Sequence, residues 1–275
     1  MTEPVDEFTD ALGTVHRPAK GEVRIVSLVP SLTELICDLG LAAHLVGRTG
    51  FCIHPRQTLR TVSKVGGTKD VKIDRVRALA PTHLIVNIDE NRRETVEALA
   101  AFVPHVIVTH PCTPQDNFAL YRLFGAVFDR RAEAERLSAE LAAALAAAHS
   151  VAAGLPPEQV IYLIWREPWM GVARDTYIAA TLAAVGWLTL PAASQVRYPQ
   201  IDWQAPGMQA AVRVFASTEP YRFGERHLAE IRALSGGLPV SLIDGEMTSW
   251  YGSRAVAGLR YLSALRRTLS AGPRP

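Results

Sequence analysis

The sequence predicts an α/β protein of two lobes that are joined by one long helix, with a ligand cleft between the lobes. Two observations predict this fold class. Strand segments rich in β-branched residues alternate with helical segments in both halves of the chain, and this alternation is typical of parallel sheets covered on both faces. A long helical segment without glycine or proline lies at mid-chain. The 275 residues, 48% of them hydrophobic, suffice for two domains of modest size.

The first half contains three predicted strands, at residues 23–28, 83–88 and 105–109, and three predicted helices, at residues 31–40, 73–79 and 91–102. Ser31 followed by Glu34 forms a capping-box pattern that opens the first helix, and Asn91 with Glu94 does the same for the third. The first ten residues carry four acidic side chains and no apolar block. We therefore expect residues 1–20 to form a loosely ordered arm.

The mid-chain segment is a predicted helix at 114–128 followed by a second one at 130–153, with nine alanines between positions 139 and 153. At 1.5 Å per residue the second helix would be a rod of roughly 36 Å. It could be a surface helix of a single domain, but its length and position favour a connector. The alternation then resumes with strands at 160–165, 211–217 and 239–243 and helices at 175–185, 225–234 and 253–269. The expected organisation is an arm (1–21), a first lobe (22–112), a helical connector (113–156) and a second lobe (157–275).

Composition excludes several classes of function. The net charge of +2 gives no electrostatic footprint for nucleic acid or an anionic membrane. No apolar run approaches the 18 residues of a membrane-spanning helix, so membrane insertion is not expected. Phosphate-loop, dinucleotide-binding, nucleophile-elbow and zinc-protease motifs are absent from the sequence. Since Met1 is not followed by a signal-like segment, the chain as written is expected in the cytoplasm, or in the periplasm if the true N-terminus is longer.

Polar residues and glycines cluster after predicted strands, where parallel sheets bind ligands. Cys52 and His54 could both reach one metal ion or act as a reactive pair, but two ligands do not make a structural zinc site. We prefer the interpretation that Cys52 is a small buried hydrophobe and His54 an ordinary loop residue. Gly66 and Gly67 would permit close approach of the backbone to a ligand, and they would serve an ordinary turn equally well.

Aromatic residues gather in the second half. Trp165, Arg166 and Trp169 lie within five residues around a proline, and tryptophan with arginine is the composition of a binding hot spot. Trp250 and Tyr251 lie between a predicted strand and the last helix and are bracketed by two glycines, and Arg254 projects from the first turn of that helix. Tyr198 and Trp203 add further rings. Flat, amphipathic side chains of this kind suit a large planar or ring-shaped ligand.

These motifs together resemble the class III (cluster A) substrate-binding proteins of ABC importers, also described as the helical backbone metal receptor superfamily. The resemblance covers residues 22–270 and is carried by segments 25–34, 46–55, 65–67, 74–88, 175–178 and 250–254. It implies two Rossmann-like lobes joined by a single long backbone helix, and a non-enzymatic protein with no intrinsic cofactor that holds a small metal-containing ligand. The most similar branch is the cobalamin-binding one, which implies corrin contacts from Phe51, Trp169, Trp250, Tyr251 and Arg254.

The resemblance also implies a partner. Exported members present one acidic residue on each lobe to arginines of the ABC permease. The first position is occupied by Asp74 and the second by Gln204, a change that should weaken a permease contact. Two alternatives to a corrinoid-binding protein stay open: an iron-siderophore or haem receptor, and an enzyme that modifies such a ligand with Cys52 and His54. The expected ligand-binding residues are Phe51, Cys52, His54, Gly66, Gly67, Trp165, Arg166, Trp169, Tyr198, Trp250, Tyr251 and Arg254.

Overall fold

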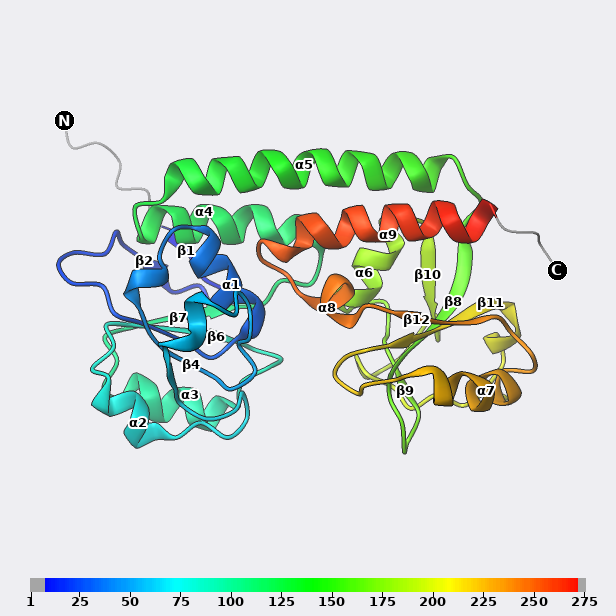
Figure 1. Cartoon of the computed structure of the whole chain (residues 1–275), viewed down its shortest axis with the longest axis horizontal. Helices are drawn as coiled ribbons and strands as arrows, with labels where there is room; N and C mark the ends of the chain where they lie inside the picture. Colours follow the sequence, from blue (N-terminus) through cyan, green and yellow to red (C-terminus); the bar gives the residue numbers. More distant parts are fainter. Residues whose placement is uncertain (1–7, 272–275) are drawn as a thin grey trace. The chain divides into compact units, whose positions relative to one another are not determined.

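The computed structural model describes residues 8–271, and these divide into two compact units (Figure 1). Unit 1 holds residues 8–111, 115–139 and 251–254, and unit 2 holds residues 112–114, 140–250 and 255–271. Each unit contains a parallel β-sheet flanked by helices, so the predicted α/β class is confirmed. Within the described residues, no helix is both long and apolar enough to cross a membrane.

The sheet of unit 1 has five parallel strands in the order β5-β4-β3-β6-β7. Their bounds are Ile25–Ser27 (β3), Leu45–Arg48 (β4), Ser63–Lys64 (β5), His83–Asn87 (β6) and His105–Thr109 (β7). The predicted strands are β3, β6 and β7, and β4 and β5 are additions. Strand β4 was not predicted from the sequence because it contains Gly47, and glycine is depleted in strands. Gly47 is required there, since a Cβ atom would lie only 2.7 Å from Leu79 Cδ1.

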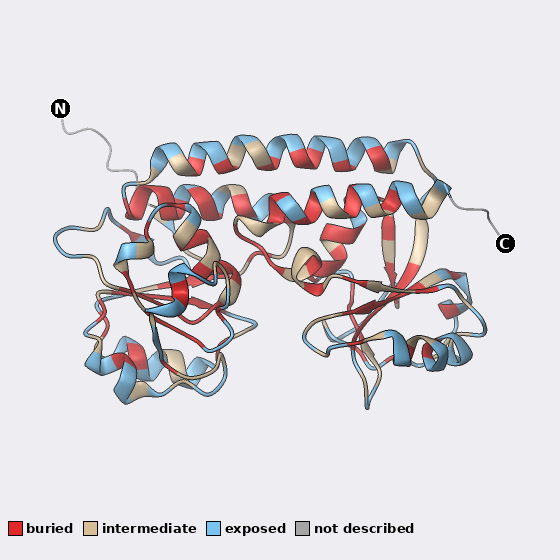
Figure 2. Cartoon of the chain, viewed as in Figure 1, coloured by how far each residue is buried: buried red, intermediate tan, exposed pale blue. Residues whose placement is uncertain are grey.

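The helices of unit 1 are Pro30–Asp38 (α1), Ile73–Ala78 (α2), Arg93–Ala100 (α3) and Asn117–Val127 (α4), with short 3-10 helices at Ala42–His44, Thr58–Arg60 and Pro114–Asp116. One face of the sheet packs on α2 and α3, whose Val76 and Leu99 join Val26, Leu84 and Val108 in an apolar core. Figure 2 shows the strands of this sheet as largely buried. The chain becomes more exposed directly after β6 and β7.

The two predicted capping boxes are wrong. Helix α1 begins at Pro30 after Val29, whose apolar side chain cannot cap it, and Glu34 is used in an ion pair described below. Helix α3 begins at Arg93, also without a side-chain cap. The Asn91 side chain instead accepts a hydrogen bond from the Asn87 N–H (2.9 Å) and donates one to the Thr68 carbonyl (3.1 Å). It therefore holds the loop after β6 rather than the helix.

The described part of the N-terminal arm is ordered, which corrects the expectation for residues 1–20. Strands Phe8–Thr9 (β1) and Val15–His16 (β2) form an antiparallel hairpin. The fully buried carboxylate of Asp10 accepts hydrogen bonds from the backbone N–H groups of Leu12 and Thr14, and lies 3.1 Å from His16 Nε2. It also accepts one from the Val108 N–H of β7, so the hairpin covers an edge of the sheet. In the sequence Asp10 is one of several acidic residues in a polar segment, and no local pattern predicts that it binds β7.

Unit 2 contains a parallel sheet in the order β10-β8-β11-β12, with β9 pairing antiparallel to β8. The bounds are Glu158–Trp165 (β8), Met170–Gly171 (β9), Trp187–Leu190 (β10), Ala211–Ser217 (β11) and Val240–Ile243 (β12). Ile161, Leu163 and Val214 lie in an apolar core that α7 and a group of aromatic residues cover. The three strands predicted in this half are present, and β9 and β10 were not foreseen.

The helices of unit 2 are Tyr177–Ala183 (α6), Glu225–Leu234 (α7), Gly245–Ser249 (α8) and Arg254–Ala271 (α9), with a 3-10 helix at Met208–Ala210. Thr176 is the N-cap of α6, and its hydroxyl accepts a hydrogen bond from the Ala179 N–H. The predicted long helix is α5, Arg131–Ala153, which is 23 residues long. Residues up to Ala139 belong to unit 1 and those from Glu140 to unit 2.

A charged network is enclosed in unit 2. The carboxylate of Glu158 accepts hydrogen bonds from Trp187 Nε1 (2.9 Å) and Arg213 Nε (3.2 Å) and pairs with the buried Arg266. Arg266 also donates to the Pro156 carbonyl (2.6 Å). Burial raises the pKa of Glu158, but the hydrogen bonds from Arg266 and Trp187 and the two guanidinium charges outweigh it, so the pKa lies below the ordinary value of 4.5.

Candidate functional site

The carboxyl ends of the unit 1 strands form the first candidate surface. Phe51 follows β4, and 63% of its side chain is exposed. Its ring lies over Gly67, where a Cβ atom would be 3.3 Å from Phe51 Cε2. Ile88, which follows β6, is 44% exposed. These two large apolar side chains follow strands of unit 1 and can contact an apolar ligand surface.

The Gly66–Gly67 pair forms a tight turn. Gly66 has a φ of +117°, and a Cβ atom there would be 2.3 Å from the Asp70 carbonyl oxygen. The Gly67 N–H donates to the same carbonyl (2.9 Å), and the Gly50 N–H donates to the Gly66 carbonyl (2.7 Å). The sequence left two interpretations of these glycines: close approach to a ligand, or an ordinary turn. The turn explains Gly66 without a ligand, and Gly67 provides space for the Phe51 ring.

Cys52 is a buried structural residue. Its Sγ lies 3.0 Å from Thr33 Oγ1 and 3.1 Å from Thr49 Oγ1, and the side chain has no exposed surface. Burial raises the pKa of the thiol, and hydrogen bonds from Thr33 and Thr49 offset this only in part. This burial agrees with the preferred interpretation of Cys52 as a small buried residue, and it disfavours a metal or reactive pair with the half-buried His54. Within residues 8–271, no three His, Cys, Asp or Glu side chains are grouped to hold a metal ion.

Acidic side chains follow the central strand of this surface. Asp89 and Glu90 come directly after the β6 segment, and Asp89 Oδ2 lies 3.4 Å from Nε2 of His110, which follows β7. The Tyr251 hydroxyl donates a hydrogen bond of 2.5 Å to Glu90 Oε1. Burial and the charge of Glu90 raise the pKa of Tyr251 well above 10, so the hydroxyl stays neutral. Glu90 and its tyrosine are the pair that sequence reasoning missed, since 161 positions separate them.

The loop 251–254 is held inside unit 1 by its polar groups. The Gly252 N–H donates to Asn117 Oδ1 (2.6 Å), and the Gly252 carbonyl accepts from the Tyr121 hydroxyl (2.8 Å). Arg254 makes a bidentate ion pair with Glu34, with distances of 2.6 and 2.7 Å. Bidentate guanidinium–carboxylate pairs are among the strongest polar contacts in proteins. These bonds give Tyr251 and Arg254 structural partners within unit 1, and their contact with a ligand stays a prediction.

Unit 2 presents an aromatic surface at the end of β8. Trp165 is 40% exposed, and its ring meets Tyr221 edge-on at a centroid distance of 5.6 Å. Arg166 is directed away to Glu230, which it contacts through Nε and Nη2 at 3.1 and 3.2 Å. Its guanidinium carbon also lies 5.8 Å from the centre of the Trp169 ring. Trp165 is thus the side chain of this loop with a free apolar face, whereas Arg166 orders the loop.

Trp169 belongs to an aromatic group that packs on the unit 2 core. It stacks on Phe223 with an interplanar angle of 9° and a centroid distance of 6.0 Å. Trp203 meets it edge-on at 6.1 Å. All three rings pack against the apolar core. Trp169 is partly buried in this group, and its contact with a ligand stays a prediction.

Trp250 is enclosed, with 8% of its surface exposed, and its Nε1–H donates to Glu219 Oε2 (3.0 Å). Like Tyr251, it is a structural residue rather than a flat ligand wall, and this corrects the sequence interpretation of the loop. Glu219 follows β11, so the bond fixes a carboxylate at a strand end of unit 2. Tyr198 is 38% exposed in the loop after β10 and stays a predicted contact.

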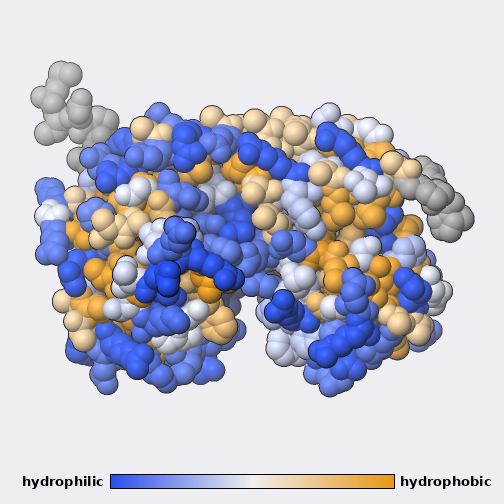
Figure 3. All heavy atoms as spheres, in the orientation of Figure 1, coloured by the Kyte–Doolittle hydropathy of each residue, from blue (hydrophilic) through white to orange (hydrophobic). Residues whose placement is uncertain are grey.

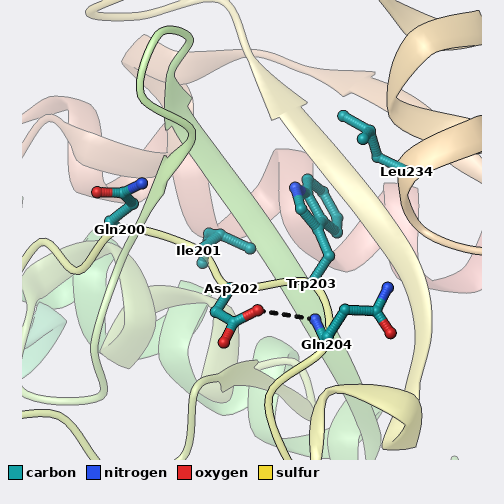
Figure 4. Close-up of a pocket in the computed structure, with 6 residues that line it drawn as sticks. All are labelled: Gln200, Ile201, Asp202, Trp203, Gln204 and Leu234. Carbon is teal, nitrogen blue, oxygen red and sulfur yellow. Dashed lines mark hydrogen bonds between the residues drawn. The ribbon is translucent and has the colours of Figure 1, made fainter.

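A cavity of about 460 Å³ lies beside the aromatic group (Figure 4). Its walls come from the loop after β10 and from the end of α7; the lining residues are Gln200, Ile201, Asp202, Trp203, Gln204 and Leu234. The buried Nε1 of Trp203 has no hydrogen-bond acceptor. Gln204, expected at the second docking position, is exposed, and its N–H donates to Asp202 Oδ1 (3.0 Å). Asp74, the first docking position, is exposed in the first turn of α2.

The fold and these strand-end surfaces are those of a ligand-binding protein, and the comparisons with known proteins agree. Residues 25–230 match the periplasmic binding protein family, to which this chain therefore belongs. A relative in sequence is the vitamin B12-binding protein of Photorhabdus laumondii subsp. laumondii. It is 23% identical over 187 residues, which cover 68% of each chain.

Solved structures with the same fold include binding proteins for two kinds of ligand. The periplasmic vitamin B12 binding protein BtuF of Vibrio cholerae superposes with a TM-score of 0.77 at 17% identity, covering 90% of this chain and 98% of that one. The periplasmic haem-binding protein RhuT of Roseiflexus sp. RS-1 gives 0.74 at 22% identity (90% and 99%), and a haem-binding protein of Pseudomonas aeruginosa gives 0.75 at 22% (92% and 95%). The resemblance to class III substrate-binding proteins is thus confirmed.

Proposed function

We propose that this chain is a non-enzymatic binding protein for cobalamin or another corrinoid. The family supports binding rather than catalysis, and the matched vitamin B12-binding protein supports the ligand. The alternative ligands are haem and iron-siderophores, since haem-binding proteins share the fold. We propose that the strand-end surface of unit 1, around Phe51, contacts the ligand, and we propose the same for the strand-end surface of unit 2, around Trp165.

The charge of the strand ends is the observation that favours a corrinoid. Carboxylates follow the strands in both units: Asp89, Glu90, Glu219, Asp244 and Glu246. Three of them accept hydrogen bonds from neutral groups: Glu90 from the Tyr251 hydroxyl, Glu219 from the Trp250 indole and Asp244 from the Met247 N–H. A corrinoid carries many side-chain amides that donate to carboxylates, whereas haem carries two carboxylates that such a surface repels.

Calorimetric titration tests the ligand class directly. The purified protein is titrated with cyanocobalamin, haem and a ferric hydroxamate under identical conditions. We expect cyanocobalamin to bind at least about tenfold more tightly than haem, a difference of about 1.4 kcal/mol. Tighter binding of haem or of the ferric hydroxamate would overturn the corrinoid proposal.

A charge-neutralising variant tests the reason for the preference. Asp89→Asn removes one strand-end charge, so it should weaken cyanocobalamin binding and strengthen haem binding. Asp70→Asn is the matched control, because Asp70 is exposed in the turn after β5 and pairs with Lys72. If both variants shift the two affinities equally, the strand-end carboxylate does not select the ligand.

Delivery of the ligand to an ABC permease is a further part of the proposal. Asp74 supports it, because its carboxylate is exposed on α2. Gln204 supplies no charge at the second position, so a permease contact would depend mainly on unit 1. Reconstitution with a candidate permease tests this: Asp74→Asn should reduce complex formation, and unchanged binding would remove Asp74 from the contact.

A further inference from the structure

A strongly basic surface lies at one edge of unit 1, in the segment of residues 56–77, which we call the basic edge. The segment carries seven basic and two acidic side chains, a net charge of +5, although the whole chain has a net charge of only +2. All seven basic side chains are exposed: Arg56, Arg60, Lys64, Lys69, Lys72, Arg75 and Arg77. The rest of the chain therefore has a net negative charge, so the small net charge of the whole chain conceals the positive charge of this segment.

The basic side chains lie close together because the segment folds back along β5, which is an edge strand of the sheet. The 3-10 helix Thr58–Arg60 leads into β5, and a glycine turn then returns the chain toward α2. Arg75 Nη1 donates to the Lys64 carbonyl (3.4 Å), and the Lys72 N–H donates to the Val65 carbonyl (2.7 Å). These bonds connect α2 with β5, so the charges share one edge of unit 1. Figure 3 shows hydrophilic side chains over much of the visible face of this unit.

Ordinary structural roles explain only part of this charge. A lysine beside a two-residue edge strand protects it from pairing with another chain, which accounts for Lys64. Arg77 covers the Phe102 ring, with its guanidinium carbon 4.0 Å from the ring centre. Only Asp70, which pairs with Lys72, and Asp74 offset the positive charge within the segment. The remaining like charges repel one another in the isolated protein.

We propose that the basic edge binds the surface of an anionic lipid bilayer. Clustered lysine and arginine side chains are attracted to anionic lipids, and binding grows with each added charge. Residues 56–77 contain no aromatic residue, so they lack the stacking groups with which proteins hold single-stranded nucleic acid. Helix α2 has six residues, which is short for a helix that reads a DNA groove. Long, exposed side chains outside the cavity described above suit a fluid charged surface better than one shaped protein partner.

Sedimentation with lipid vesicles tests the proposal. Wild-type protein is mixed with vesicles of phosphatidylcholine alone and with vesicles that also contain phosphatidylglycerol. Binding should require phosphatidylglycerol and should fall as salt rises, since the Debye length shrinks to about 8 Å at 0.15 M. Equal binding to both kinds of vesicle, or to neither, would overturn the proposal.

A pair of charge-matched variants locates the surface. The triple variant Arg56→Glu, Arg60→Glu and Lys69→Glu should reduce partitioning by about 100-fold or more, at about fivefold for each basic side chain replaced. The control variant carries the same change in charge on exposed residues of unit 2: Arg222→Glu, Arg232→Glu and Arg260→Glu. An equal loss in both variants would mean that net charge, not the basic edge, governs binding.

Two further measurements keep the outcomes distinct. Retention of wild-type protein on double-stranded DNA at salt concentrations that release it from the vesicles would overturn the proposal in favour of nucleic acid. Cyanocobalamin titration of the triple variant should give the wild-type affinity, because none of its three substitutions falls on a proposed ligand contact. The lipid proposal can therefore fail or stand independently of the proposed ligand.

Discussion

Replacing Trp165 with alanine should weaken cyanocobalamin binding while leaving unit 2 folded. The side chain is 40% exposed, which leaves roughly 100 Å² of a tryptophan available to a ligand. Covering that area at about 25 cal/mol per Å² would contribute about 2.5 kcal/mol. The substitution should therefore weaken binding by up to about 60-fold. Its effect on stability should be small, because the Trp165 ring meets Tyr221 edge-on at the surface and is not enclosed by the core.

Trp169→Ala is the comparison, because its ring stacks on Phe223 and packs on the core. Loss of a core aromatic costs about 3–5 kcal/mol of unfolding free energy, so this variant should unfold early in urea. Both variants are measured by calorimetric titration and by urea unfolding followed by circular dichroism. A Trp165→Ala protein that binds normally but unfolds early would refute the reasoning, since the exposed ring would then serve the fold and not the ligand.

Three further predictions concern the fold. Asp10→Ala should remove the carboxylate that joins the N-terminal hairpin to β7, and hydrogen exchange should show loss of protection in residues 8–16. Burial, His105 and His16 lower the pKa of His83 to about 4, so unfolding free energy should fall by about 3 kcal/mol as the pH drops from 6.5 to 4, a loss that His83→Asn removes. Glu158→Gln should cost about 3 kcal/mol at neutral pH, because Arg266 keeps its buried charge.

Each of these has an outcome that contradicts it. Unchanged exchange in the Asp10 variant would mean that the backbone bonds of the hairpin suffice. An identical acid dependence in the His83 variant would assign that slope to other groups. For Glu158 the sign is the same as for His83: its pKa is also depressed, so its contribution is present above pH 4.5 and is lost as the pH falls. The variant and the wild type should converge in acid, and a constant difference would exclude the ionised pair as its cause.

The sequence predicted the fold class and most central strands, because each of β3, β6, β8 and β11 is an apolar run with its own local signal. It did not predict β4, whose glycine is set by packing against Leu79. It assigned Glu34 to a local cap, but the carboxylate is taken by Arg254, which lies 220 positions away. The roles of Trp250 and Tyr251 depend on distant carboxylates that no local pattern reveals.

The non-contiguous make-up of unit 1 has a consequence for biosynthesis. Its last piece, residues 251–254, supplies partners for Glu34, Glu90 and Asn117, all of which are synthesised much earlier. A ribosome adding about 5–20 residues each second would need several seconds or more between Asn117 and Gly252. During that interval the nascent unit holds polar groups without their native partners. Co-translational completion of unit 1 must therefore wait until residue 254 has been synthesised, and a fragment that ends before residue 251 should mature poorly.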